Sequence, residues 1–104
     1  MDNKKNLKEI ITTIRAKEND LINIGVNKII IFGSFVTGKE TEQSDIDILF
    51  SLKNETKLGI LKIIKSIDEI KDVLKDLHNL DIHHHRTVKK TIYKEIIMNG
   101  IQVF

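Results

Sequence analysis

The sequence predicts a small α/β domain, and two patterns support this prediction. Apolar residues recur at helical spacing near the start, in the middle and near the end of the chain. Short runs with the character of strands lie between these segments. Because helices and strands alternate, we expect one small sheet flanked by helices. The 104 residues suit a single domain over residues 1–104, since a domain usually takes about 100–200 residues.

The first element is expected to be one helix that begins after Asn6 and ends at Gly25. Asn6 and Glu9 have the spacing of an N-cap and its reciprocal partner. Gly25 suits the position that follows a helix C-terminus. The apolar residues between these ends are spaced as on one face of a helix: Leu7, Ile10, Ile11, Ile14, Leu21 and Ile22.

Two strands follow, with a short helix between them. Residues 28–32 end in a continuous apolar run bounded by glycine, which is typical of a strand buried on both faces. After a polar loop over 38–44, residues 45–50 alternate between polar and apolar with a period of two. This alternation places Asp45 and Asp47 on one face of the second strand and its apolar residues on the other.

The second half of the chain is expected to hold a long helix and a third strand. After a polar turn over 53–56, apolar spacing predicts an amphipathic helix with a break near Ser66. Its core positions are expected to be Leu58, Leu61, Ile64, Ile67, Ile70, Leu74 and Leu77. Residues 80–84 alternate again. Leu80 and Ile82 are expected on the core side of this strand, with Asp81, His83 and His85 on the opposite side.

A last helix and a short strand complete the prediction. Thr87 can cap the helix, and Gly100 stops it. Residues 101–104 then form the terminal strand. The apolar positions of the helix are Val88, Ile92, Ile96 and Ile97.

The composition excludes several classes of protein. The absence of cysteine rules out disulfide scaffolds, thiol catalysis and thiolate metal sites, and it suits the cytoplasm. Lys and Arg number 17 against 15 Asp and Glu, so the net charge of +2 lacks the basic excess of a dedicated nucleic-acid binder. No apolar run approaches the roughly 18 residues that span a bilayer, and the first residues lack the apolar stretch of a signal peptide. We therefore expect a cytoplasmic protein without a membrane partner, and nucleic acid is not a favoured partner.

The Asp45 and Asp47 pair is the feature that points most directly to chemistry. The two aspartates are two residues apart on the strand, so their Cα atoms lie roughly 6.6 Å apart on one face. Carboxylates held this close repel each other unless cations neutralise them, and Mg²⁺ is the cation that suits oxygen ligands best. Asp is also depleted in strands, so folding alone explains the pair poorly. A solvated edge face with two acidic residues is the simpler interpretation of such a pair in isolation.

Gly33 and Ser34 follow the first strand directly. A glycine there lets backbone N–H groups turn toward an anion, and the serine hydroxyl can donate to a phosphate oxygen. An ordinary turn with Ser34 as an N-cap is the better explanation of the two residues when they are considered alone. Only together with the aspartates do they suggest a site for phosphate and metal.

These residues carry a resemblance to a known family. Gly33-Ser34, Gly38 and Ser44-Asp45-Ile46-Asp47 match the signature G-S-x(3)-G-x(5)-S-D-x-D, so the chain resembles the minimal nucleotidyltransferases of the DNA polymerase beta superfamily. The resemblance implies a small mixed sheet flanked by helices. It also implies that Gly33 and Ser34 hold a nucleoside triphosphate. Asp45, Asp47 and Asp81 would be the catalytic residues and would bind two divalent ions, Mg²⁺ or alternatively Mn²⁺.

The sequence departs from this family at one position of the turn. Many relatives carry arginine directly before the second glycine, where this chain has Thr37. Lys39 or Lys53 could supply the missing positive charge, although both also suit solvated loops. His83, His84 and His85 do not form a zinc site from one regular strand, because alternation turns His84 away from its neighbours. Titratable histidines at the surface are the expectation for this run, and the alternative is that His83 or His85 approaches a nucleotide or nucleophile.

The resemblance implies transfer of a nucleoside monophosphate, with AMP from ATP as the expected case, to an acceptor hydroxyl. Stand-alone members resembling this chain are MntA-like antitoxins that adenylylate a tyrosine of an HEPN-domain toxin, so an HEPN protein is the expected partner. The alternative is a non-catalytic antitoxin that neutralises its partner by surface contact. The intact acidic set favours the enzyme, because a pure binding module has no need for repelling aspartates. The oligomeric state is left open.

Overall fold

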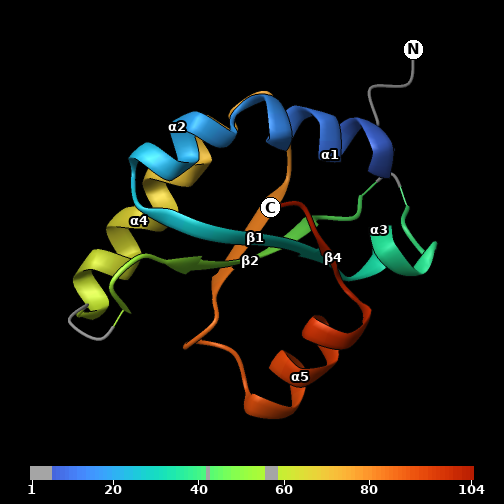
Figure 1. The fold of residues 1–104 in the computed structure, drawn as a ribbon. Coiled ribbons are helices and arrows are strands. Elements are labelled where there is room, and N and C mark those ends of the chain that lie inside the picture. The colour runs from blue at the N-terminus through green and yellow to red at the C-terminus, as the bar shows by residue number, and fades with distance from the viewer. Residues whose placement is uncertain (1–5, 42, 56–58) are drawn as a thin grey trace.

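The computed structural model describes residues 6–41, 43–55 and 59–104, and it shows one four-stranded sheet with helices on both faces (Figure 1). The strands are β1 (Val26–Phe32), β2 (Ile46–Leu52), β3 (Leu80–His84) and β4 (Ile101–Gln102). The helices are α1 (Leu7–Ala16), α2 (Glu18–Asn23), α3 (Ser34–Thr37), α4 (Ile60–Val73) and α5 (Lys90–Asn99). The predicted α/β class, with a small mixed sheet flanked by helices, is confirmed.

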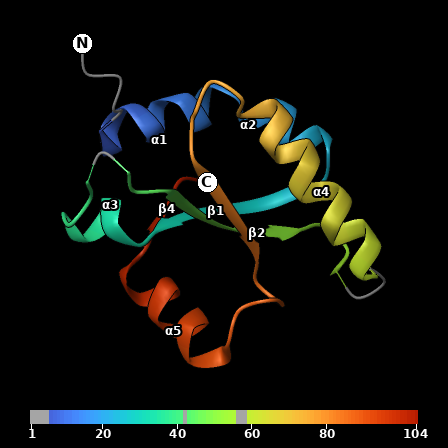
Figure 2. The same ribbon diagram turned by 180° about the vertical axis from the view of Figure 1, so that it is seen from behind.

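The sheet has the strand order β3-β2-β1-β4 and mixes both kinds of pairing. β1 runs antiparallel to β2 and to β4, whereas β2 and β3 are parallel. A parallel pair needs a long crossover connection, and α4 supplies it between β2 and β3. Viewed from behind, β3 is the orange strand beside α4 (Figure 2).

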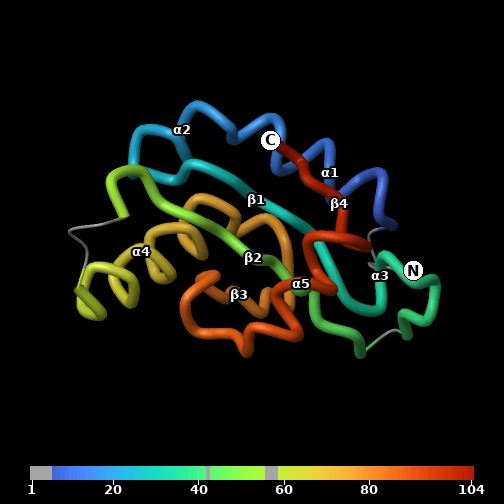
Figure 3. Tube along the Cα trace, turned by 60° about the horizontal axis from the view of Figure 1, so that its bottom comes forward, coloured from blue at the N-terminus to red at the C-terminus, as the bar shows by residue number. Residues whose placement is uncertain are grey.

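The two faces of the sheet are covered unequally. The main core lies between one face and α1, α2 and α4, and it includes Ile29, Ile31, Ile48 and Phe50 of the central strands. The opposite face carries a smaller cluster in which Ile30 and Leu49 pack against Ile96 of α5. α5 lies below the sheet in Figure 1 and comes forward in Figure 3. β1 is therefore buried on both faces, as predicted.

The N-terminal helix begins as expected but is interrupted. Asn6 caps it, since its Oδ1 accepts from the Glu9 backbone N–H at 2.9 Å. The prediction of one helix up to Gly25 is wrong: a tight turn at Lys17, whose N–H bonds to the Ile14 carbonyl at 3.0 Å, separates α1 from α2. No glycine or proline marks this position. The interruption lets the two helices arch over the twisted sheet while Leu21 stays buried (Figure 1).

Helix α4 differs from its prediction in two ways. It is unbroken at Ser66, whose buried hydroxyl donates to the Lys62 carbonyl at 2.8 Å and so has a partner within the helix. Its buried face is only partly as predicted: Ile70, Leu74 and Leu77 are buried, but Leu61 is 79% and Ile64 51% exposed, and Ile63 is buried instead. A repeated spacing of three falls about 60° short of a full turn at each step, so the predicted residues cannot share one face. Thr56 and Leu58 lie outside the described residues.

The C-terminal elements follow the predicted order with shifted ends. α5 begins at Lys90 rather than at Thr87, whose hydroxyl bonds instead to the His84 carbonyl at 2.9 Å. Gly100 ends α5 as predicted. A Cβ atom at Gly100 would lie 2.6 Å from the Ile96 carbonyl oxygen and 2.7 Å from a methyl group of Ile30, so only glycine fits against β1. In the described part of the chain, no helix is both long and apolar enough to cross a bilayer.

Candidate functional site: two carboxylates and a histidine beside a glycine turn

The parallel pairing of β2 with β3 brings Asp47 and Asp81 together. The two residues are register partners on adjacent strands. Both side chains point away from Ile46, Ile48 and Ile82, which are buried in the main core. The predicted outward orientation of Asp47 and Asp81 is confirmed. One acidic side chain from each strand therefore lies at the same place on the face that also carries α5.

Helix α5 covers only part of this sheet face and leaves the region of Asp47 and Asp81 partly open. α5 packs through Ile96 on Ile30 and Leu49, which is two residues beyond Asp47 on β2. The side chain of Asp81 is 49% exposed. Solvent and ligands can therefore reach the carboxylates from the side where α5 does not cover the strands.

His83, which the sequence predicts only as a titratable histidine at the surface, joins the two carboxylates. Its Nε2 lies 3.1 Å from Oδ2 of Asp81, and its side chain is 34% exposed. Its ring also lies 5.9 Å from the ring of Phe32 on β1. The alternation of residues 80–84 placed His83 on the face of Asp81, but only the parallel register shows that Asp47 shares this position.

Gly33 is needed because the Asp47 carboxylate occupies the space beside it. Gly33 has φ of 81°, a conformation that side chains disfavour. A Cβ atom built there would lie 2.2 Å from Oδ2 of Asp47. The antiparallel pairing of Phe32 with Asp47 produces this approach. The turn after β1 is thus shaped around a carboxylate, which the sequence pattern alone did not indicate.

The geometry makes Asp47 a weaker acid than usual. Burial together with the charge of Asp81 and a hydrogen bond between the two carboxyl groups raises the pKa of Asp47 to about 6. The charge of His83 opposes this increase, and the charge of Asp45 adds a smaller contribution to it. Two carboxylates in such contact repel each other unless a cation neutralises them. Their oxygen donors therefore fit a hard divalent ion such as Mg²⁺.

The remaining predicted residues lie around this centre at different distances. Asp45 is exposed and directly precedes β2, so it flanks the contacting pair rather than joining it. Ser34 begins α3 directly after Gly33. Lys39 is exposed, and its N–H bonds to the Ser34 carbonyl at 3.0 Å, so it stays beside the turn. Lys53 follows the opposite end of β2, roughly 20 Å along the strand from Asp47, and cannot supply the positive charge there.

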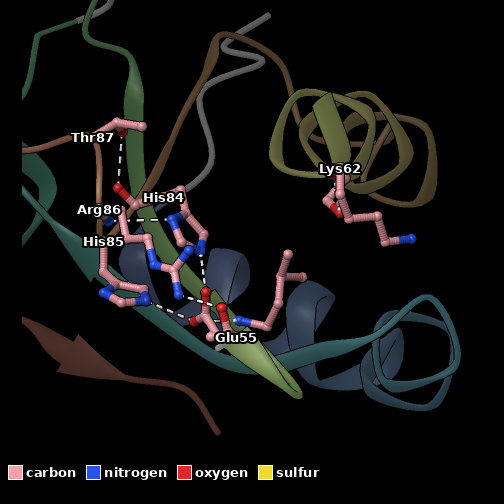
Figure 4. Close-up of polar contacts among 8 residues, drawn as sticks. Glu55, Lys62, His84, His85, Arg86 and Thr87 are labelled. Atoms are coloured by element: carbon pink, nitrogen blue, oxygen red, sulfur yellow. Dashed lines mark hydrogen bonds and ion pairs between the residues drawn. The ribbon is translucent and has the colours of Figure 1, made fainter. Parts of the chain in front are cut away.

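A second cluster of titratable groups lies where β2 and β3 end (Figure 4). Glu55 accepts from Nε2 of His84 and from Nε2 of His85, each at 2.6 Å, and from the Leu52 N–H at 2.9 Å. His84 is fully buried, so the expectation of surface histidines is wrong for His84. His85 follows β3 and lines a small cavity with Leu49 and Tyr93 on the face that carries α5 and Asp81, so its predicted face is confirmed. No local pattern indicates a role for Glu55, because its histidine partners lie about thirty residues further along the chain.

Hydrogen bonding defines the protonation of this second cluster. The Arg86 backbone N–H donates to Nδ1 of His84 at 3.1 Å, so Nδ1 is the acceptor and Nε2 carries the proton that Glu55 accepts. Burial lowers the pKa of His84 against the opposing effect of Glu55. Burial acts to raise the pKa of Glu55, but the Leu52 N–H and the two histidines together lower it. A metal ion bound to Nε2 of His84 would move the ring proton to Nδ1, where it would face the N–H of Arg86. The cluster is therefore a hydrogen-bonded network that joins the two strand ends.

Comparison with known families decides which chemistry the acidic site belongs to. The profile of the family described as "Polymerase beta, Nucleotidyltransferase" matches residues 5–104. The chain belongs to this family. It is accordingly a nucleotidyltransferase, and the resemblance carried by Gly33, Ser34 and the aspartates is confirmed at the level of the family.

Individual relatives agree with this assignment. The chain is 34% identical over 97 residues to a protein of Methanocaldococcus jannaschii named "Putative protein adenylyltransferase MJ0126", covering 89% of this chain and 97% of that protein. The fold matches a chain of a toxin-antitoxin complex solved with AMP-PNP, with a TM-score of 0.63, 20% identity and coverage of 90% and 72%. It also matches a chain of the complex of a tri-AMPylated Shewanella oneidensis HEPN toxin with an MNT antitoxin, with a TM-score of 0.52, 18% identity and coverage of 86% and 71%.

Proposed function

We propose that this nucleotidyltransferase moves AMP from ATP to a tyrosine hydroxyl of an HEPN-domain partner and thereby acts as its antitoxin. The observation that carries the proposal is the contact of Asp47 with Asp81 beside the Gly33 turn. Such a pair costs stability unless it binds cations, so a catalytic role explains its presence. The adenylyltransferase name of the relative and the HEPN complexes among the fold neighbours support the choice of reaction and partner.

The proposed reaction needs few chemical groups from the protein. The acceptor oxygen attacks the α-phosphorus of ATP, the bond from that phosphorus to the bridging oxygen breaks, and pyrophosphate leaves. Bound divalent ions would neutralise charge on the attacking and leaving oxygens. Asp45, Asp47 and Asp81 are proposed to hold them. Asp81 would also orient the acceptor hydroxyl and take its proton, while Gly33 and Ser34 receive the triphosphate.

Labelled ATP tests the transferred group and the acceptor together. The protein is mixed with a candidate HEPN-domain partner, Mg²⁺ and ATP labelled on either the α- or the γ-phosphorus. The proposal expects label on the HEPN protein from α-labelled ATP alone, and mass spectrometry should place one AMP unit on tyrosine. Label from γ-labelled ATP would instead show phosphorylation. Neutralisation of the toxin without any label would favour the non-catalytic antitoxin.

The contribution of the acidic site is tested by single substitutions. Asp45→Asn and Asp47→Asn are each expected to abolish transfer while the protein remains folded. Asp68→Asn is a matched control, because Asp68 is exposed on α4 and lies outside the site. Transfer at the wild-type rate by either site variant would contradict the assignment of that residue.

A further inference from the structure

The acidic site contains a nitrogen donor as well as oxygen donors. Asp47, Asp81 and His83 each offer one donor atom, and these three atoms lie within 4.8 Å of one another. From this geometry we propose that His83 is a direct ligand of one catalytic cation, so that this ion has a mixed nitrogen and oxygen donor set. The inference rests on the proposed function and specifies which ion that function prefers.

The distance between His83 and Asp81 fits two neighbouring ligands of one ion. An octahedral ion with bonds of about 2.1 Å keeps adjacent donors about 3.0 Å apart. Nε2 of His83 and Oδ2 of Asp81 are 3.1 Å apart. A small ion can therefore replace the contact between them without moving either strand.

The surroundings of His83 keep its nitrogen at this position. The parallel register sets His83 one pleat beyond Asp81 on the same face, and the Phe32 ring lies against the imidazole. The side chains of His83 and Asp81 remain about one third and one half exposed, so an ion can reach both from solvent. His84 and His85 point their Nε2 atoms at Glu55 instead and do not compete for the ion.

The donor set determines which ion is favoured. Mg²⁺ is bound mainly through oxygen, whereas imidazole is a ligand for first-row transition ions. Replacement of one oxygen donor by imidazole therefore shifts the site toward Mn²⁺. We expect wild-type protein to bind Mn²⁺ at least about tenfold more tightly than Mg²⁺, and His83→Gln to remove most of this preference.

Spin-echo electron paramagnetic resonance of Mn²⁺ tests direct ligation independently of activity. Metal-free wild-type protein is loaded with Mn²⁺, and the echo decay is examined for modulation by a coordinated ¹⁴N nucleus. The proposal expects this modulation in wild-type protein and in the control His78→Gln, since His78 is exposed in the turn after α4. It expects no modulation in His83→Gln, and His83→Asn serves as the second variant if that protein does not fold.

The possible results separate this inference from the proposed function. Bound Mn²⁺ without nitrogen modulation in wild-type protein overturns the inference, and so does modulation that persists in His83→Gln. If AMP transfer with Mg²⁺ continues in either case, the proposed function stands and only the ligand assignment fails. If wild-type protein binds neither ion and transfers no AMP, both proposals fail.

Discussion

Asp47 is held by the fold next to a second carboxyl group, and this arrangement costs free energy in the absence of a cation. Burial and Asp81 raise its folded pKa to about 6, from 3.8 for an unperturbed Asp. Between these two values the folded protein binds more protons than the unfolded chain. The free energy of unfolding that Asp47 contributes is therefore greatest below about pH 4 and falls as the pH rises to about 6.

Asp47→Asn should reveal this cost in the metal-free protein. We expect the variant to exceed the wild type in free energy of unfolding at pH 7 by about 1–2 kcal/mol, a value reduced by solvent screening of a half-buried pair. The advantage should disappear by pH 4. Urea unfolding across this pH range measures it. Asp45→Asn, at an exposed position, is the control and should change the free energy of unfolding little. Equal changes in the two variants would contradict the contact between Asp47 and Asp81.

Ser34 is expected to act on the nucleotide rather than on the fold. Ser34→Ala should weaken ATP binding by about 1–2 kcal/mol, the scale of a lost hydrogen bond to a charged group. Thr12→Ala, at an exposed position of α1, is the matched control. Calorimetric titration with ATP and Mg²⁺ compares the two variants. Equal ATP affinity in both variants and the wild type would remove Ser34 from the phosphate site.

At the scale of elements, the Glu55 network stabilises the fold by joining the ends of β2 and β3. Burial lowers the pKa of His84. The Leu52 N–H and the two histidines together lower the pKa of Glu55. The unfolded chain therefore takes up more protons than the folded protein as the pH falls below about 6.5. This network loses its stabilising contribution on acidification, which is the opposite dependence to that of Asp47.

Glu55→Gln should destabilise the protein by about 2–3 kcal/mol at pH 7, because two histidines and a backbone N–H lose their charged acceptor. The difference between variant and wild type should persist from pH 7 to 5 and shrink only below about pH 4.5, because the pKa of Glu55 is lowered from 4.5 and the carboxylate stays ionised above it. Thermal unfolding followed by circular dichroism measures both values. Asp76→Asn, at an exposed position after α4, controls for the loss of one acidic charge. A difference that stays constant below pH 4.5 would contradict the lowered pKa of Glu55.

Local patterns could predict most elements but not the contacts between them. Alternation in residues 45–50 and 80–84 correctly placed Asp47 and Asp81 away from the core. Helical spacing located α4 but misjudged its buried face, because Leu61 and Ile70 are nine residues and about half a turn apart. The meeting of Asp47, Asp81 and His83 depends on strand register, and the Glu55 network joins distant segments. Neither is encoded within one short stretch of sequence.

For the whole molecule, binding of a nucleotide and a cation should offset the repulsion in the site. A ligand that binds only the folded state at one hundred times its Kd adds about 2.7 kcal/mol to the free energy of unfolding. We therefore expect ATP with Mg²⁺ to raise the Tm of the wild type, and to raise that of Asp47→Asn much less. Differential scanning fluorimetry compares them, with Asp68→Asn expected to respond like the wild type. An equal increase in Tm for all three proteins would place ATP binding elsewhere.

The central claim is that the paired carboxylates of β2 and β3 carry out AMP transfer, and the transfer rate of Asp81→Asn under saturating ATP and Mg²⁺ tests it most directly. Asp81 is proposed to act on the acceptor hydroxyl, so its loss should lower the maximal rate about 10²–10⁴-fold while ATP affinity changes little. Asp68→Asn should transfer at the wild-type rate. A full transfer rate in folded Asp81→Asn protein would contradict the account.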